Sequence, residues 1–211
     1  MRIDEVINYD LEAELCSEVL RRDCQPWISE SGLWTLLRGA SVMPDTYTKV
    51  KVRQDRKPLD ASPKFQKFQN LIFHKAGLIA NRSNSLFTTG STDHAKAFGN
   101  LCVVFPIGKF NYTWSPNIRD GYEMLDRIYT LPSGKTFGSS LYDKLEDDTF
   151  DPNEYAISMQ KALEYRGDDG SLVQAIKSGN EIMIHCQEAY LIDREFYSDG
   201  VFPILEDEFI K

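Results

Sequence analysis

The stretch Arg82–Ser115, RSNSLFTTGSTDHAKAFGNLCVVFPIGKFNYTWS, places a hydroxyl-rich segment between two apolar ones. Its pattern predicts a strand over Ser85–Thr89, a turn at Gly90, a short helix opened by Ser91 or Thr92, and a buried strand over Leu101–Phe105. Hydroxyl groups and the free N–H groups of a helix N-terminus can converge on a polar ligand. The sequence therefore predicts a binding site at this strand–turn–helix junction.

Two distant segments have the composition to complete such a site. Arg38 and Gly39 stand in LLRGAS, at the end of an apolar run, and Glu181 opens the apolar run in GNEIMI. We expect these two segments and the junction to meet in one cleft.

Composition limits the classes of protein to consider. The 211 residues suffice for one sizeable core, and 42% hydrophobic with 27% charged residues is ordinary for a globular chain. A net charge of −8 argues against a surface that coats nucleic acid but leaves room for a local basic patch. No P-loop, GxGxxG or nucleophile-elbow pattern occurs, which excludes the corresponding phosphate-loop, Rossmann and hydrolase interpretations.

Cysteine and histidine usage favours no metal site. The four cysteines lack CxxC spacing, and only three histidines are present, none of them spaced with a cysteine pair. Buried, reduced thiols and a cytoplasmic setting fit this pattern. The longest apolar runs are far shorter than a membrane span, so no membrane association is expected.

The rest of the chain predicts a single domain, residues 1–211, with helices and strands of ordinary length. Residues 1–30 form an N-terminal helical segment, and residues 194–211 form an acidic tail that packs loosely. Further predicted helices cover 9–22 (capped by Asp10), 63–77 (capped by Ser62), 119–129, 152–165 and 171–177, and further strands cover 33–38, 47–57, 110–114, 181–186 and 190–192. Residues 132–152 are predicted to be a long surface excursion.

Each candidate site residue has a functional and a structural interpretation. Arg38 can hold a phosphate or ribose, with Gly39 admitting the ligand to the backbone, or it can form a surface ion pair. The hydroxyls of Thr88, Thr89 and Ser91 can orient a sugar or a catalytic group, or simply cap a helix.

Other residues leave similar alternatives. Arg82 can contact a ligand or bridge to a nearby carboxylate. Glu181 can accept a ribose hydroxyl and stabilise positive charge on a sugar carbon, or point to water. His94 and His185 can supply acid–base chemistry or be structural histidines of the core or of a strand edge. The basic segment 47–57, YTKVKVRQDRK, either meets anionic groups or is a solvated strand face.

The order of these motifs resembles the ADP-ribosyltransferase superfamily. An Arg-Gly strand, a hydroxyl-rich strand followed by Ala-x-x-Phe-Gly, and a strand-opening Glu occur in that order in LLRGAS, TTGS and GNEIMI. The chain is also similar, over most of residues 34–193, to a set of proteins from tailed bacteriophages. The resemblance implies an α+β fold with split antiparallel β-sheets and flanking helices that grip NAD.

The resemblance also implies a mechanism. Arg38 would hold the nicotinamide ribose and phosphate, the hydroxyls at 88–91 would position Glu181, and Glu181 would stabilise an oxocarbenium-like transition state as nicotinamide leaves. Gly39 and Arg82 would complete the NAD site, and Phe87 or Phe98 would stack on nicotinamide or belong to the core. Gly179 stands where arginine-modifying members carry a second Glu, which argues against an arginine acceptor.

Three functions follow as hypotheses. The first is a phage-encoded mono-ADP-ribosyltransferase that modifies a host protein or nucleic acid in the host cytoplasm, with packaging in the virion left open. The second is a non-catalytic phage structural or binding protein that keeps the fold. The third is an NAD glycohydrolase that uses water as acceptor at the same site.

Overall fold

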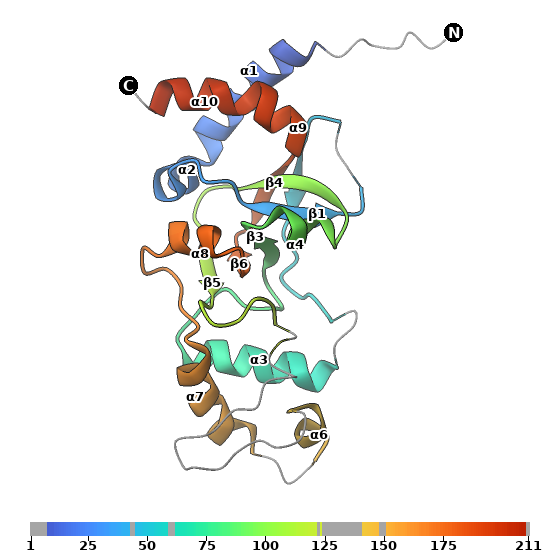
Figure 1. Cartoon of the computed structure of the whole chain (residues 1–211), viewed down its shortest axis with the longest axis vertical. Helices are drawn as coiled ribbons and strands as arrows, with labels where there is room; N and C mark the ends of the chain where they lie inside the picture. The colour runs from blue at the N-terminus through green and yellow to red at the C-terminus, as the bar shows by residue number, and fades with distance from the viewer. Residues whose placement is uncertain are drawn as a thin grey trace, which may run out of the picture.

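The computed structural model of this chain describes residues 8–42, 45–58, 62–121, 123, 141–147 and 151–209. Its elements stack in three tiers along the long axis of the molecule (Figure 1). Helices from both ends of the chain form one tier, a β-sheet lies in the middle, and α3, α6 and α7 form the opposite tier.

The described helices are short and several have capped N-termini. They are α1 (Tyr9–Asp23), α2 (Gln25–Ser31), α3 (Pro63–Lys75), α4 (Thr92–Lys96), α6 (Leu141–Glu146), α7 (Pro152–Leu163), α8 (Leu172–Ser178), α9 (Arg194–Phe196) and α10 (Phe202–Phe209), with the π-helical turn η1 (Tyr197–Val201) between the last two. None of the helices in the described ranges has the length and apolar content that a membrane crossing requires.

Seven strands form one antiparallel sheet in the order β2-β7-β4-β1-β3-β6-β5. The strands are β1 (Leu37–Ala40), β2 (Tyr47–Lys51), β3 (Leu86–Thr89), β4 (Asn100–Pro106), β5 (Asn111–Trp114), β6 (Glu181–His185) and β7 (Glu188–Asp193). The fold is therefore mixed α+β with an antiparallel sheet, which confirms the predicted fold class at this level.

Strand pairing is least extensive at the centre of the sheet. β1 and β3 share a single register pair, Leu37 with Thr89, whereas β1 pairs with β4 through four positions and β3 with β6 through four. The central junction therefore divides the sheet into β2-β7-β4-β1 on one side and β3-β6-β5 on the other.

Two hydrophobic clusters meet at β6. Ile182 and Ile184 belong to the cluster that α1, α2, α8 and the C-terminal helices build around the sheet. Met183, between them in sequence, belongs to the second cluster, under α3, α6 and α7. Because successive strand residues point to opposite faces, one strand contributes to both cores.

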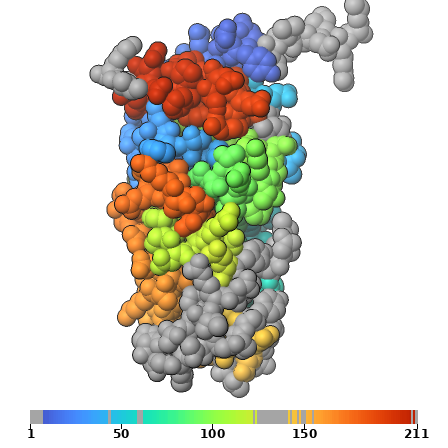
Figure 2. Space-filling model, viewed as in Figure 1, coloured from blue at the N-terminus to red at the C-terminus, as the bar shows by residue number. Residues whose placement is uncertain are grey.

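The C-terminal segment is part of the main core, so the prediction of loose packing is wrong. Tyr197, Val201 and Leu205 are buried there, at 1%, 0% and 0% exposure. These apolar side chains recur at helical spacing among acidic ones, and they pack against α1. In the space-filling view the C-terminal helices, in red, lie against the N-terminal helix, in blue (Figure 2).

Local signals place most elements within a few residues of their predicted bounds. Ser62 caps α3, accepting a hydrogen bond from Phe65 N at 3.1 Å, as predicted. The cap of α1 is Asn8 rather than Asp10, which lies in the first turn. β1 begins at Leu37 rather than at 33, because Leu33 has a positive φ of 65° and cannot extend a strand.

Two predictions fall largely outside the described residues. Of the helix predicted over 119–129, only its first residues and position 123 are described. Within the excursion predicted over 132–152, the helix α6 is described at 141–146, and residues 151–152 open α7.

Candidate functional site

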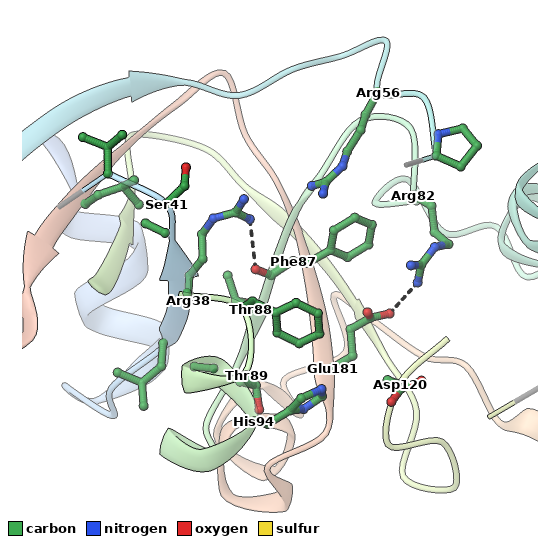
Figure 3. A pocket seen from close by; sticks show the side chains of 18 of the residues that line it. Arg38, Ser41, Arg56, Arg82, Phe87, Thr88, Thr89, His94, Asp120 and Glu181 are labelled. Atoms are coloured by element: carbon green, nitrogen blue, oxygen red, sulfur yellow. Dashed lines mark hydrogen bonds and ion pairs between the residues drawn. The ribbon is translucent and has the colours of Figure 1, made fainter. Parts of the chain in front are cut away.

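A cavity of about 580 Å³ opens beside the central junction of the sheet. It is lined by parts of β1, β3 and the first residue of β6, together with the segment that follows β2 and the start of α4 (Figure 3). Its volume lies within the range typical of small-molecule sites. The three segments that the sequence predicts to meet, around Arg38, Thr88–Thr89 and Glu181, all line this cavity.

Arg38 projects where β1 and β3 separate. Its Nη1 donates a hydrogen bond to the carbonyl oxygen of Phe87 at 3.1 Å, beyond the single register pair that joins the two strands. The guanidinium forms no ion pair with any described residue. Burial lowers the pKa of Arg38 below its ordinary value. A largely buried cation without a carboxylate is available to an anionic ligand.

Arg56 is a second buried cation, and no individual role for it was predicted. It belongs to the extended segment after β2, and its Cζ lies 4.3 Å from the ring centroid of Phe87. Burial, reinforced by the neighbouring guanidinium groups of Arg38 and Arg82, lowers the pKa of Arg56 to about 10. Within the described part of the chain it has no acidic partner either.

Arg82 bridges to Glu181, the alternative that the sequence left open for it. The Nη1–Oε1 distance is 2.7 Å, and the two side chains are only 14% and 18% exposed. The guanidinium Cζ also lies 4.4 Å from the centroid of the Phe87 ring. Both arginines therefore use Phe87 as an aromatic support, with its ring between them in Figure 3.

Backbone contacts fix the position of Glu181. Thr88 Oγ1 donates to the carbonyl of Ile182, and Thr89 Oγ1 donates to the carbonyl of Gly179, each at 2.7 Å. These carbonyls lie just after and just before Glu181, whose own N–H donates to Arg119 O at 2.7 Å. The hydroxyls thus orient the strand that carries the carboxylate, without touching the carboxylate itself.

Ser91 has the structural role among the hydroxyl residues. Its Oγ accepts the N–H of His94 and caps α4, and its own N–H donates to Thr89 Oγ1 at 3.0 Å. Ser91 does not line the cavity. Of the three predicted hydroxyl residues, the structure places Thr88 and Thr89 at the cavity and Ser91 behind it.

The two predicted glycines are required by packing. A Cβ at Gly39 would collide with the carbonyl oxygen of Ala95 and with the backbone of Phe98, so Gly39 brings α4 against β1 rather than clearing space for a ligand. Gly179 has a φ of 71°, and a Cβ there would lie 3.2 Å from Ser91 Cβ. An acidic side chain two positions before Glu181 is therefore disfavoured by both conformation and space.

The aromatic rings at the cavity are not equivalent. Phe87 is covered by two guanidinium groups, whereas Phe98 is 69% exposed at the rim. His94 also lines the cavity, next to Phe98 at 5.8 Å between ring centroids, and its buried Nδ1 has no hydrogen-bond partner among the described residues. Phe98 is therefore the ring available for stacking on a ligand.

The described residues that line the cavity carry a net positive charge. Arg82 and Glu181 neutralise each other, which leaves Arg38, Arg56 and Lys57 against Asp120. In a protein of net charge −8, this concentration of cations favours an anionic ligand. Among the described residues, no group of three or more His, Cys, Asp or Glu side chains could hold a metal ion.

Comparison of the chain with protein-family models, with curated protein sequences and with solved structures finds no match.

Proposed function

We propose that this protein is an NAD-dependent mono-ADP-ribosyltransferase, encoded by a phage and acting on a macromolecule in the host cytoplasm. One observation carries the proposal: Arg38, the Thr88–Thr89 strand and Glu181, far apart in sequence, line a single cavity. A guanidinium, a hydroxyl-anchored strand and a carboxylate are the groups that the resemblance assigns to NAD cleavage.

The cations of the cavity suit the diphosphate of NAD. Arg38 and Arg56 are both partly buried and without carboxylate partners among the described residues, and guanidinium groups bind phosphate oxygens through paired hydrogen bonds. Phe98, exposed at the rim, offers its ring to the nicotinamide. NAD would therefore lie with its diphosphate near Arg38 and Arg56 and its reactive ribose near Glu181.

Glu181 would act on the ribose. Only Oε1 is held by Arg82, and Oε2 bonds to no described residue, so one oxygen remains to accept the ribose 2′-hydroxyl. As the bond from C1′ to nicotinamide breaks, its electron pair goes to nicotinamide and positive charge builds on the sugar. A fixed carboxylate in a shielded site stabilises that charge without reorganisation.

The shape of the sheet supports the same proposal. The single register pair between β1 and β3 divides the sheet at the place where the cavity opens. The split pair of sheets implied by the resemblance would have its cleft at this junction.

The decisive test is NAD binding and nicotinamide release by the wild type and by Glu181→Gln. The isosteric change keeps the hydrogen-bonding shape but removes the charge, so we expect NAD binding to persist and nicotinamide release to fall about 10²- to 10³-fold. Glu195→Gln, at an exposed position on α9, is the matched control and should retain full activity.

The outcomes separate the three hypotheses. Transfer of radiolabel from NAD to a macromolecule in a host lysate supports the transferase, and protease or nuclease sensitivity of the label gives the acceptor class. Nicotinamide release without a labelled macromolecule indicates an NAD glycohydrolase. Neither binding nor release by the wild type would refute catalysis and leave a structural or binding protein.

A further inference from the structure

A line of basic side chains, none of them ion-paired with a described residue, leads from the edge of the sheet into the cavity. Lys51 ends β2, an edge strand, and Arg53 is exposed two residues further along the extended chain. Arg56 and Lys57 follow and line the cavity. We define these four residues as the basic track.

The track carries a net positive charge within the described part of the chain. Lys49, the preceding basic residue of β2, is paired with Glu188 at 2.7 Å, and this carboxylate also faces Lys51 across the strand pair. None of the four track residues forms an ion pair with a described residue. The exposed Asp55 is the one acid within the segment. The track therefore keeps an excess of positive charge on an acidic protein.

The backbone under the track is held in place. Val52 N donates to Gln187 O at 2.9 Å, and Arg56 N donates to Ser83 O at 2.7 Å. Gln54 Nε2 lies 3.1 Å from both Val52 O and Cys186 O. Because the backbone that carries these side chains is fixed, a ligand that contacts several of them binds at a lower entropic cost.

We propose that the basic track binds a single-stranded nucleic acid and leads it to the cavity as the acceptor of ADP-ribose. Lys51 and Arg53 are alternate residues and lie about 7 Å apart along the chain, which is comparable with the spacing of phosphates along an extended nucleic-acid strand. After a bend at residues 54–55, Arg56 and Lys57 continue the track at the cavity. Several cations along one continuous segment suit a polyphosphate better than a single phosphate. The inference rests on the proposed function only for the transfer step, in which Arg56 binds the diphosphate of NAD and the strand keeps its contacts with the other three track residues.

The site also disfavours the main protein alternative, an arginine acceptor. Arg82 already bonds to Oε1 of Glu181, and the conformation of Gly179 disfavours a second carboxylate two positions before it. A cationic acceptor would enter a cavity of like charge, whereas a polyanion is attracted to it. In the transfer, the C1′–nicotinamide bond breaks, a bond from C1′ to a nucleophilic atom of the strand forms, and the proton of that atom passes to solvent.

The first experiment measures binding without NAD. The anisotropy of a fluorescent single-stranded oligonucleotide is titrated with the full chain at several salt concentrations. Four phosphate contacts predict a slope of about −2.8 in log K against log salt, and Lys51→Ala/Arg53→Ala should halve it to about −1.4. The charge-matched control Lys109→Ala/Lys161→Ala, at exposed positions outside the cavity, should keep the wild-type slope.

The second experiment adds labelled NAD and asks whether nuclease-sensitive label appears on the oligonucleotide. Label on the oligonucleotide supports the inference. Absent binding, equal losses in both double variants, equally tight binding of polyglutamate, or binding without label each overturns it. Nicotinamide release is followed separately in the absence of oligonucleotide, so failure of the proposed function is recognised independently.

Discussion

Phe98 and Phe87 differ in what covers their rings, and the difference predicts different roles in ligand binding. Phe98 is 69% exposed, so Phe98→Ala should leave the free energy of unfolding nearly unchanged. Loss of an aromatic stacking surface should weaken NAD binding by about 1.4 kcal/mol, which is roughly tenfold in Kd. Calorimetric titration of the variant checks this expectation.

The control for this prediction is Ile79→Ala, which removes another exposed apolar side chain, 52% exposed and outside the cavity. It should bind NAD like the wild type. An unchanged Kd for Phe98→Ala would contradict stacking of Phe98 on NAD. The described cavity lining has no other exposed aromatic ring that could stack in its place.

Single site residues could be predicted from the sequence where their neighbours along the chain mark a turn or the end of a strand. Arg38 before Gly39, and Glu181 after a Gly-Asn turn, are recognisable because a turn or strand end is a local feature. Arg56 was visible only as one of several cations in a basic segment. Its place at the cavity depends on the contact of its backbone with Ser83, which no local pattern encodes.

Among the elements, β3 holds β6 in position through side-chain hydroxyls. Thr89→Val keeps the shape of the side chain but leaves Gly179 O without its donor and Ser91 N without its acceptor. We expect a loss of about 1–3 kcal/mol in the free energy of unfolding. Nicotinamide release should fall as well, because the affected turn sets the position of Glu181.

Thr113→Val is the matched control for this prediction. Thr113 lies in β5 of the same sheet and is fully buried, and its Oγ1 has no hydrogen-bond partner among the described residues. Replacing an unpartnered buried hydroxyl by a methyl group should be neutral or stabilising. Urea denaturation of both variants tests this expectation. Equal losses in the free energy of unfolding would mean that the hydrogen bonds of the Thr89 hydroxyl do not stabilise the fold.

A carboxylate at the end of α1 ties this helix to β7. Asp23 accepts hydrogen bonds from Arg22 and, at 2.8 Å, from Tyr190, and the bond from Arg22 is the main cause that lowers the pKa of Asp23 to about 2. A lowered pKa in the folded state adds stability above the ordinary pKa of about 3.8, and this stability is lost as the pH falls towards 2.

Asp23→Asn should therefore reduce the dependence of stability on pH between about 4 and 2. Urea midpoints measured across this range check the prediction, with Asp10→Asn, exposed in the first turn of α1, as the control. Parallel pH profiles for the wild type and Asp23→Asn would show that the pKa of this carboxylate is not lowered in the folded protein.

Elements with local start signals were predicted well, and elements defined by tertiary contacts were not. Ser62 and Ser91 cap the helices that follow them, as expected from a hydroxyl before a helical pattern. β1 is shorter and later than predicted because the turn at Leu33 interrupts an apolar run that periodicity alone would extend. The short pairing of β1 with β3 at the centre of the sheet is a tertiary feature that the sequence pattern does not encode.

For the whole molecule, the C-terminal segment belongs to the main hydrophobic core, so we expect it to contribute to the stability of the entire fold. The acidic composition of residues 194–211 predicts a loosely packed tail. The prediction is wrong because the few apolar residues of this segment are buried against α1, which is distant in sequence. β6 in turn joins the two hydrophobic clusters through alternate residues. The cavity lies at this shared strand, so stability at one end of the chain and ligand binding at the centre should be coupled.

Leu205→Ala tests this coupling. Leu205 is fully buried in the main core, so truncation should cost about 2–5 kcal/mol in the free energy of unfolding. Phe209→Ala, on the same helix but 44% exposed, removes a larger side chain and should cost only roughly 0.5 kcal/mol. Because both clusters share β6, urea unfolding of each variant should remain a single transition that also abolishes NAD binding. Two separate transitions, or a Leu205→Ala variant that loses its C-terminal helix while binding NAD normally, would show that the tail is energetically independent of the site.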